Sequence, residues 1–232
     1  TYDNTNIREY ARAFTGFQYG GPENTQFRWA KQNFNDPMKL WDSEHDLEPK
    51  TLLSGVSTPK RTLQTPDRGL AAMADLEAVV DSLYLHPNVG PFLGRLLIQR
   101  LTTSNPSPAY IRRVALAFNN NGRGVRGDMR AVIRAILMDP EARSYPTVTS
   151  KKREPYLTLM QLAKTFDAQP LSGRYPSATY MYDFMLQEPF ESPSVFNFYQ
   201  PAYRPSGEMT DQNLNGPEFQ IMTAVTAHDH LN

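Results

Sequence analysis

The sequence predicts a mostly α-helical fold, a multi-helix globular bundle whose helices are joined by long, ordered loops rich in aromatic residues and proline. Three observations support this prediction. Apolar residues recur at helical spacing through much of residues 67 to 166. Residues that start or stop helices flank most of these stretches. The 232-residue chain also has 19 prolines, which indicates connections with restricted backbone geometry.

The composition excludes several classes of protein. The 24 basic and 24 acidic residues cancel, which gives no support for a nucleic-acid-binding face or for a surface that binds acidic membranes. Cysteine is absent, so disulfides, thiolate zinc sites and cysteine nucleophiles are excluded. No apolar run approaches the roughly 20 residues that a transmembrane helix needs. At this length the chain can bury a substantial core.

The first predicted helix spans residues 5 to 16. Asn4 or Thr5 can cap its start, and Gly16 can end it. Its apolar face would hold Ile7, Tyr10, Ala11 and Phe14. Residues 17 to 66 hold aromatic side chains among Gly, Pro, Asn and Asp without a sustained helical period. We therefore expect an irregular region there, with room for one small β-hairpin around Gln26 to Phe34.

A helical body is expected over residues 67 to 187. Its first helix should stop at His86-Pro87, because a proline disfavours helical geometry in the residue before it. Ser107-Pro108, Asp128 and Glu154-Pro155 carry the signals of later helix starts. In the helix that stops at His86-Pro87, the residues predicted to face inward are Leu70, Met73, Ala74, Leu76, Val79, Val80 and Leu83. An aromatic loop at 188–216 and a terminal helix at 217–230 would follow, giving one domain over residues 1 to 232.

The aromatic loop has two interpretations. The stretch from Gln187 to Gly207 is too aromatic for a linker and too rich in proline for a helix or a central strand. Exposed rings on a proline scaffold could stack on sugars or bind a partner chain. Alternatively, the rings could be the apolar contacts by which the loop covers the helical body, since an ordered loop must bury something to offset its entropy. The binding-surface candidates are Phe196, Phe198, Tyr199 and Tyr203.

His45-Asp46, with Lys50 four residues later, is the best candidate for chemistry. An imidazole and a carboxylate in one loop could supply two ligands of a divalent metal, or a base and its orienting partner. Further oxygen ligands could come from Asp42, Glu44 and Glu48. Alternatively, His45 and Asp46 could hydrogen-bond the loop backbone and hold Lys50 in an ion pair, which would order an irregular segment.

Several phrases of the sequence occur in an order that resembles a known bacterial family, the domain of unknown function 1800 (DUF1800). They are Ala11-Arg12-Ala13-Phe14-Thr15-Gly16-Phe17, His45-Asp46 with Lys50, Leu53-Ser54-Gly55, Leu85-His86-Pro87 with Phe92, Phe118, the helix from Arg130 to Pro140, Lys152-Arg153-Glu154-Pro155, and Pro193 to Gly207. The likeness covers nearly the whole chain but only the C-terminal portion of the family's usual length. We therefore expect the chain to be a piece of a longer protein.

The resemblance implies a location and a partner, but no reaction. Members of the family are typically predicted to be exported, so a periplasmic or secreted protein is expected. They are often encoded beside a second protein that resembles alkaline phosphatases or sulfatases, which would be a candidate partner.

Two functions from different classes remain open at the level of sequence. The first is an exported helical protein that acts by binding in an envelope-associated or extracellular assembly, with Pro193 to Gly207 and the loop from Phe17 to Asp67 as its interaction surface. The second is a metal-dependent or hydrolytic enzyme acting on an envelope polymer such as a polysaccharide, with His45 and Asp46 in its site. A nucleic-acid partner is disfavoured by the charge balance.

Overall fold

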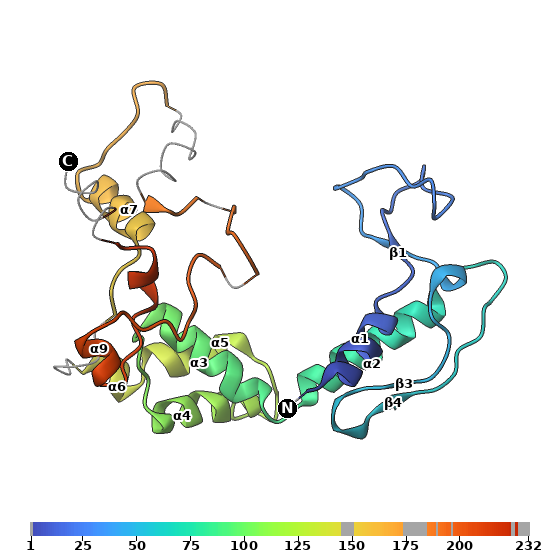
Figure 1. Ribbon diagram of the computed structural model, residues 1–232, viewed down its shortest axis with the longest axis horizontal. Coiled ribbons are helices and arrows are strands. Elements are labelled where there is room, and N and C mark those ends of the chain that lie inside the picture. Colours follow the sequence, from blue (N-terminus) through green and yellow to red (C-terminus); the bar gives the residue numbers. More distant parts are fainter. Residues whose placement is uncertain are drawn as a thin grey trace. The chain divides into compact units, whose positions relative to one another are not determined.

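The computed structural model describes residues 2–144, 151–173, 185–188, 190–195, 197–223 and 226. These residues form a mainly helical structure with two small antiparallel sheets, which confirms the predicted fold class (Figure 1). The chain divides into unit 1, Thr1–Val89, and unit 2, Gly90–Asn232, and each unit is described by itself. The expectation of one domain over residues 1 to 232 stays a prediction. Among the described residues, no helix is both long and apolar enough to span a membrane.

Unit 1 contains two helices, four two-residue strands and two short 3-10 helices. They are α1 (Asn4–Ala13), β1 (Phe17–Gln18), β2 (Lys39–Leu40), η1 (Asp42–Glu44), β3 (Lys50–Thr51), η2 (Leu53–Gly55), β4 (Ser57–Thr58) and α2 (Leu70–Leu85). The predicted cap at Asn4 or Thr5 is wrong, because both lie inside α1 and its cap is Asp3. The Asp3 carboxylate accepts from the backbone N–H of Asn6, while the Asn6 side chain accepts from the N–H of Asp3.

The predicted hairpin at Gln26 to Phe34 is wrong, because the strands lie on either side of that stretch. Strand β1 pairs with β2, with Phe17 opposite Leu40, and the two strands close a long loop. Inside the loop, hydrogen bonds from one side chain replace a strand ladder. The Asn24 amide donates to the carbonyl oxygens of Gly20 and Lys31, and its Oδ1 accepts from the Lys31 N–H at 2.7 Å.

The core of unit 1 lies where α1, β3 and α2 meet. Ala13, Leu52 and Val79 are buried together there, with Tyr10 and Ala78 packed against them. The predicted inward face of α2 is correct at Val79 but wrong at four positions, which are 40% to 54% exposed: Leu70, Met73, Val80 and Leu83. The buried residues of α2 are Ala71, Ala72, Asp75 and Val79. Small side chains permit close packing of the neighbouring segments, and Asp75 is turned inward by basic partners.

Unit 2 contains the helices that follow. They are α3 (Val89–Leu101), α4 (Pro108–Asn119), α5 (Met129–Leu137), α6 (Pro140–Arg143), α7 (Pro155–Thr165), α9 (Glu208–Asp211) and the 3-10 helix η3 (Pro217–Gln220). The predicted starts at Ser107 and Asp128 are confirmed, since both side chains accept hydrogen bonds from the first turn of their helix. Helix α7 begins at Pro155, as its sequence predicts.

The core of unit 2 is built mainly from α3, α4 and α5. Its most buried residues in these helices are Ile98, Tyr110, Val114, Ala115, Phe118, Val132 and Ile136. Tyr110 is fully buried, and its hydroxyl donates to the Ile136 carbonyl oxygen at 2.7 Å, which ties α4 to α5. Gly94 of α3 lets α4 approach closely, because a Cβ there would lie 3.2 Å from Cγ1 of Val114.

The C-terminal part of unit 2 differs in detail from the prediction. The aromatic loop expected at 188–216 contains the short helix α9. The terminal helix expected at 217–230 begins as η3, and residues 221–223 are not helical. Most of the rest of that predicted helix lies outside the described residues, as does Phe196.

Candidate functional site

Two of the three candidates of the sequence, His45 and Lys50, meet at a residue that the prediction did not include, Asp75 of α2. Lys50 Nζ lies 2.6 Å from Asp75 Oδ2, and His45 Nε2 lies 3.2 Å from the same oxygen. The second oxygen, Oδ1, accepts from Arg61 Nε at 2.8 Å. The side chains of His45, Lys50 and Asp75 are 0% exposed. We call these four residues the Asp75 cluster.

Local backbone structure places each member of the cluster. Lys50 and Leu52 point inward and Thr51 outward, as alternation along an extended segment requires. His45 follows η1, and Gly16 passes close to it at a positive φ of 81°; a Cβ on Gly16 would lie 2.6 Å from the carbonyl oxygen of Trp41. Asp75 lies on the buried face of α2.

Both ring nitrogens of His45 face oxygen atoms of the protein. Nδ1 lies 3.0 Å from the carbonyl oxygen of Thr15 and 3.2 Å from its hydroxyl, and Nε2 faces Asp75. A metal-bound histidine must instead direct a nitrogen lone pair at the metal. The ring is therefore held by protein partners on both sides.

Asp46 faces a different partner from His45. Its carboxylate accepts from Arg12 Nε at 2.7 Å and from Arg12 Nη2 at 3.1 Å. The same guanidinium also donates to Glu9 at 2.9 and 3.0 Å, and Glu9 accepts from the backbone N–H of Thr51. This pair joins α1 to the loop after η1 through a fork geometry that suits arginine.

The basic partners determine how these carboxylates titrate. The side-chain hydrogen bonds from Arg12 lower the pKa of Asp46 from 3.8 to about 2. Burial alone would raise the pKa of Asp75, but hydrogen bonds from Lys50, Arg61 and His45 outweigh burial and lower it. Both groups are therefore carboxylates at neutral pH.

The Asp75 cluster connects segments of the chain inside unit 1. Lys50 Nζ also donates to the backbone carbonyl oxygens of Asp46 and Glu48, so all three of its protons are used. Asp42, a candidate oxygen ligand, accepts instead from the Ala72 N–H at the start of α2, while Glu44 and Glu48 are exposed. Within the described part of the chain, no three His, Cys, Asp or Glu side chains are grouped to hold a metal ion.

Sequence reasoning missed Asp75, Arg61 and Arg12. One signal for Asp75 was present, because it stands three residues after Ala72 and four before Val79 in a predicted helix. That spacing puts a carboxylate on the buried face, where it needs a basic partner. Arg61 gave no signal, since its contact with Asp75 depends on the path of an irregular segment.

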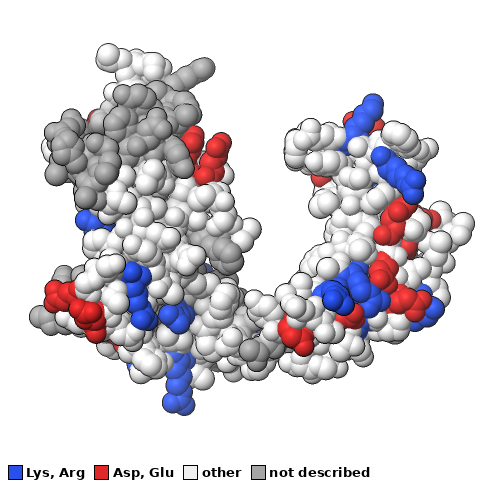
Figure 2. Space-filling view, in the orientation of Figure 1, with Lys and Arg blue, Asp and Glu red and all other residues white. Residues whose placement is uncertain are grey.

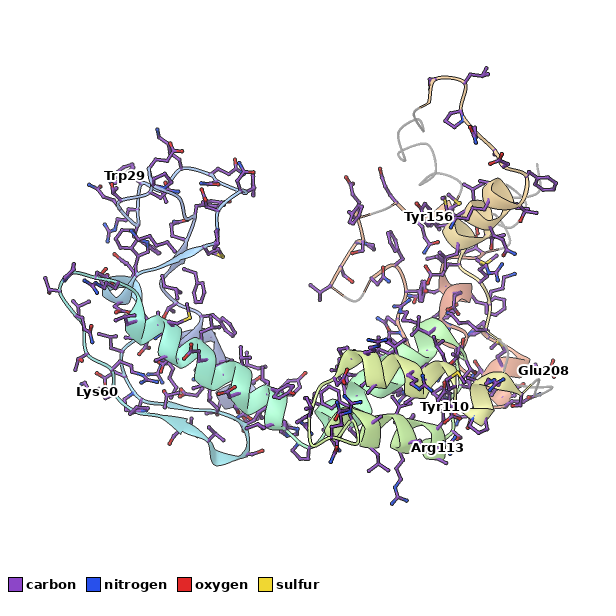
Figure 3. The ribbon with its side chains drawn as sticks, turned by 180° about the vertical axis from the view of Figure 1, so that it is seen from behind. Trp29, Lys60, Tyr110, Arg113, Tyr156 and Glu208 are labelled. Atoms are coloured by element: carbon purple, nitrogen blue, oxygen red, sulfur yellow. The ribbon has the colours of Figure 1, made fainter. Side chains whose placement is uncertain are left out.

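The two most exposed large apolar side chains among the described residues of unit 1, Trp29 and Phe34, lie on the Tyr19–Met38 loop, which β1 and β2 close. Trp29, Phe34 and Met38 are 81%, 79% and 60% exposed. Figure 3 shows Trp29 at the outer end of this loop. In Figure 2 the loop beyond β1 is mostly white with a few separate charged patches, whereas acidic and basic residues lie close together around α1 and β3. The Asn24 hydrogen bonds and the edge-on contact of Tyr19 with Phe34, at 5.9 Å between ring centroids, order the loop.

The binding-surface candidates in the aromatic loop of unit 2 differ in how far their side chains are exposed. Tyr199 is only 2% exposed, so its ring is a core contact and not part of an open surface. Its hydroxyl donates to Glu154, and burial together with that carboxylate raises its pKa. Phe198 and Tyr203 are half-buried, whereas Phe190 is fully exposed. Phe196 lies outside the described residues.

Comparison with known proteins gives one result. The family model described as "Protein of unknown function (DUF1800)" matches residues 1–231. No match to the chain was found among curated proteins or among solved structures.

Proposed function

The chain belongs to the DUF1800 family, whose function is unknown, and on that premise we propose that it is a binding protein of an exported assembly. Its contact surface would be the Tyr19–Met38 loop, and its partner a protein at the cell envelope or outside the cell. The observation that carries the proposal is the exposure of Trp29 and Phe34, at 81% and 79%, on a loop ordered by internal hydrogen bonds.

Exposed aromatic residues on an ordered loop favour binding for an energetic reason. Tryptophan bound in a partner's pocket is among the strongest contributors to protein interfaces. Binding normally costs the entropy of ordering the loop, and here Asn24 and the β1–β2 pair have already restricted it. Trp29 and Phe34 can thus be buried in a partner with little further loss of freedom.

The charges of the loop indicate what kind of partner fits. Glu23 and Asp36 balance Arg28 and Lys31, so the loop as a whole is neutral. An apolar pocket with a polar rim on another protein matches this surface better than an acidic or basic one. The co-encoded protein that resembles alkaline phosphatases or sulfatases, which the family resemblance implies, is the partner we propose. Export to the periplasm or the medium would bring the two proteins together.

No second function is proposed at the Asp75 cluster. An enzyme acting on an envelope polymer would need His45, Asp46 or Lys50 to face an open position. His45 and Lys50 are fully buried against Asp75, and the Asp46 carboxylate is bound by Arg12. The same contacts support a structural role, in which the cluster holds residues 45 to 61 against α2.

The test measures the affinity of the full-length protein for the purified co-encoded protein. We expect Trp29→Ala and Phe34→Ala each to weaken binding roughly 10- to 30-fold, as loss of an interface anchor does. Phe166→Ala removes an equally exposed aromatic residue, 77% exposed, directly after α7 of unit 2 and should leave affinity unchanged. Melting temperatures of Trp29→Ala and Phe166→Ala should equal that of the wild type, because neither ring is buried. Phe34→Ala also removes the ring contact with Tyr19, so Trp29→Ala is the decisive variant.

Three outcomes would contradict the proposal. Wild-type protein that does not bind the co-encoded protein would exclude that partner, and Trp29→Ala binding with wild-type affinity would exclude the loop. Recovery of the native protein only from the cytoplasmic fraction of its host would exclude the exported assembly.

A further inference from the structure

A small cavity in unit 2 is lined by three residues that each have a buried polar atom without a hydrogen-bond partner among the described residues. It lies between α3, the Tyr199–Pro201 segment and η3, and it has room for about one water molecule. Gln99 Oε1, Arg100 Nη1 and Glu218 Oε2 are buried at its wall and find no hydrogen-bond partner among the described residues. Buried polar atoms are nearly always satisfied, so three of them around one cavity point to a bound molecule.

The orientation of each atom is fixed by the rest of its side chain. Gln99 Nε2 donates to the carbonyl oxygens of Ser104 at 3.0 Å and Pro201 at 3.1 Å, so the amide cannot be turned over. Glu218 is 1% exposed, and its Oε1 is paired with Lys151. That pairing leaves Oε2 as the only acceptor that Glu218 can offer to the cavity.

Arg100 provides the donor of the site. Its guanidinium lies over the ring of Tyr199, 4.5 Å from the centroid, and Nη1 is 3.8 Å from Glu154 Oε1, which is too long for a hydrogen bond. Nη1 is therefore available to an acceptor in the cavity. The wall thus offers two acceptors and one donor.

These properties select a neutral molecule with two hydrogens to donate and one lone pair to accept. Arg100 and Lys151 balance Glu154 and Glu218, so a charged guest would disturb the balance of the surrounding charges. Size, charge and hydrogen-bonding pattern together match water.

We propose that this cavity is a specific binding site for one water molecule. The water donates to Gln99 Oε1 and Glu218 Oε2 and accepts from Arg100 Nη1. It joins α3 to η3, two elements more than a hundred residues apart in the sequence. Direct bonds between Asn105 and Asn215, at 2.9 and 2.7 Å, already connect the same two regions, and the water completes their attachment.

A crystal structure of the full-length protein tests the occupant. We expect one ordered water within hydrogen-bond distance of all three atoms. Crystals soaked in rubidium chloride should show no anomalous peak there, since a peak would assign the site to a monovalent cation and overturn the proposal. A cavity closed by movement of Gln99 or Glu218 would overturn it as well.

Oxygen-17 relaxation dispersion tests the site in solution, because it counts waters that stay bound while the protein tumbles. Leu96→Phe enlarges a side chain at the cavity wall and should reduce the count by one. Leu116→Phe makes the same change at a position of α4 that is 56% exposed and should leave the count unchanged. An unchanged count in a folded Leu96→Phe protein would contradict the proposal, and the crystal structure decides the matter if that variant fails to fold.

Discussion

Asp75 is a buried carboxylate that contacts basic side chains from three separate places in the sequence, His45, Lys50 and Arg61. Burying a charge costs free energy unless the charge is paired, so the contribution of each cluster residue to stability depends on the other residues. The cluster therefore fixes the path of residues 45 to 61 against α2. Such a path could not form from local preferences, because the segment has little regular structure.

Asp75→Asn should be strongly destabilising, since it keeps the shape of the side chain but leaves Lys50 buried without a counter-charge. We expect a loss of about 3–5 kcal/mol in the free energy of unfolding, measured by urea denaturation. Lys60→Met breaks an exposed pair with Glu48 and should cost about 1 kcal/mol or less. Equal losses in the two variants would show that Asp75 is not the anchor we describe.

The Arg12–Asp46 pair should make stability depend on acid pH. The folded pKa of Asp46, about 2, lies below its ordinary value of 3.8, so the folded state binds its proton less readily than the unfolded state does. The resulting stability is present above pH 3.8 and is lost as the pH falls towards 2. In Arg12→Met, NMR titration should show the Asp46 pKa rising towards 3.8. An unchanged pKa would exclude Arg12 as the cause.

At the residue scale, the sequence located part of the candidate site. His45, Asp46 and Lys50 are recognisable because imidazole, carboxylate and amine occur together in a loop. Their division into two groups, with His45 and Lys50 on Asp75 and Asp46 on Arg12, depends on contacts over 25 to 34 residues. Spacing along the chain carries no information about such contacts.

Among the elements, the start of α2 depends on one glycine. Gly69 has φ of 65°, and a Cβ there would lie 2.5 Å from both Cβ and the carbonyl oxygen of Leu40 in β2. Gly69→Ala should cost more than about 2 kcal/mol, because backbone strain and steric overlap add. Gly122 also has a positive φ, of 89°, but a Cβ added there would have no atom within 4 Å. Gly122→Ala should therefore lower the free energy of unfolding by only about 1–2 kcal/mol.

Chemical denaturation of both variants separates the two contributions. A Gly69→Ala protein no less stable than Gly122→Ala would mean that Leu40 moves aside freely, and that β2 does not constrain α2.

Helix ends were easier to predict than helix faces. Ser107 and Asp128 predict the starts of α4 and α5 correctly, because a capping side chain bonds to backbone groups within one turn of its own position. The buried face of α2 was misjudged because hydrophobicity alone selects Leu70 and Met73 over Asp75. Which face is buried depends on the neighbours, and those come from residues far away in the sequence. An ordered loop was predicted in this region, but the role of Asn24, whose side chain supplies much of the hydrogen bonding of the Tyr19–Met38 loop, was not.

For the whole molecule, the two units have separate cores, one around Val79 and one around Tyr110 and Ile136. Hydrogen exchange of the full-length protein should show this separation. In Asp75→Asn we expect faster exchange in α1, β3 and α2, while the amides of α4 and α5 keep their wild-type protection. Equal acceleration in α4 and α5 would show that both units unfold together and would support the predicted single domain.

The position of Trp29 also determines what tryptophan fluorescence can report about this protein. The chain has two tryptophans, Trp29 and Trp41, and both belong to unit 1. Trp29 is open to solvent and to collisional quenchers such as iodide, whereas Trp41 is partly covered and has the Lys39 ammonium 3.9 Å from its ring. Fluorescence excited at the red edge of indole absorption thus reports on the surroundings of two side chains of unit 1, and iodide distinguishes the exposed one from the covered one.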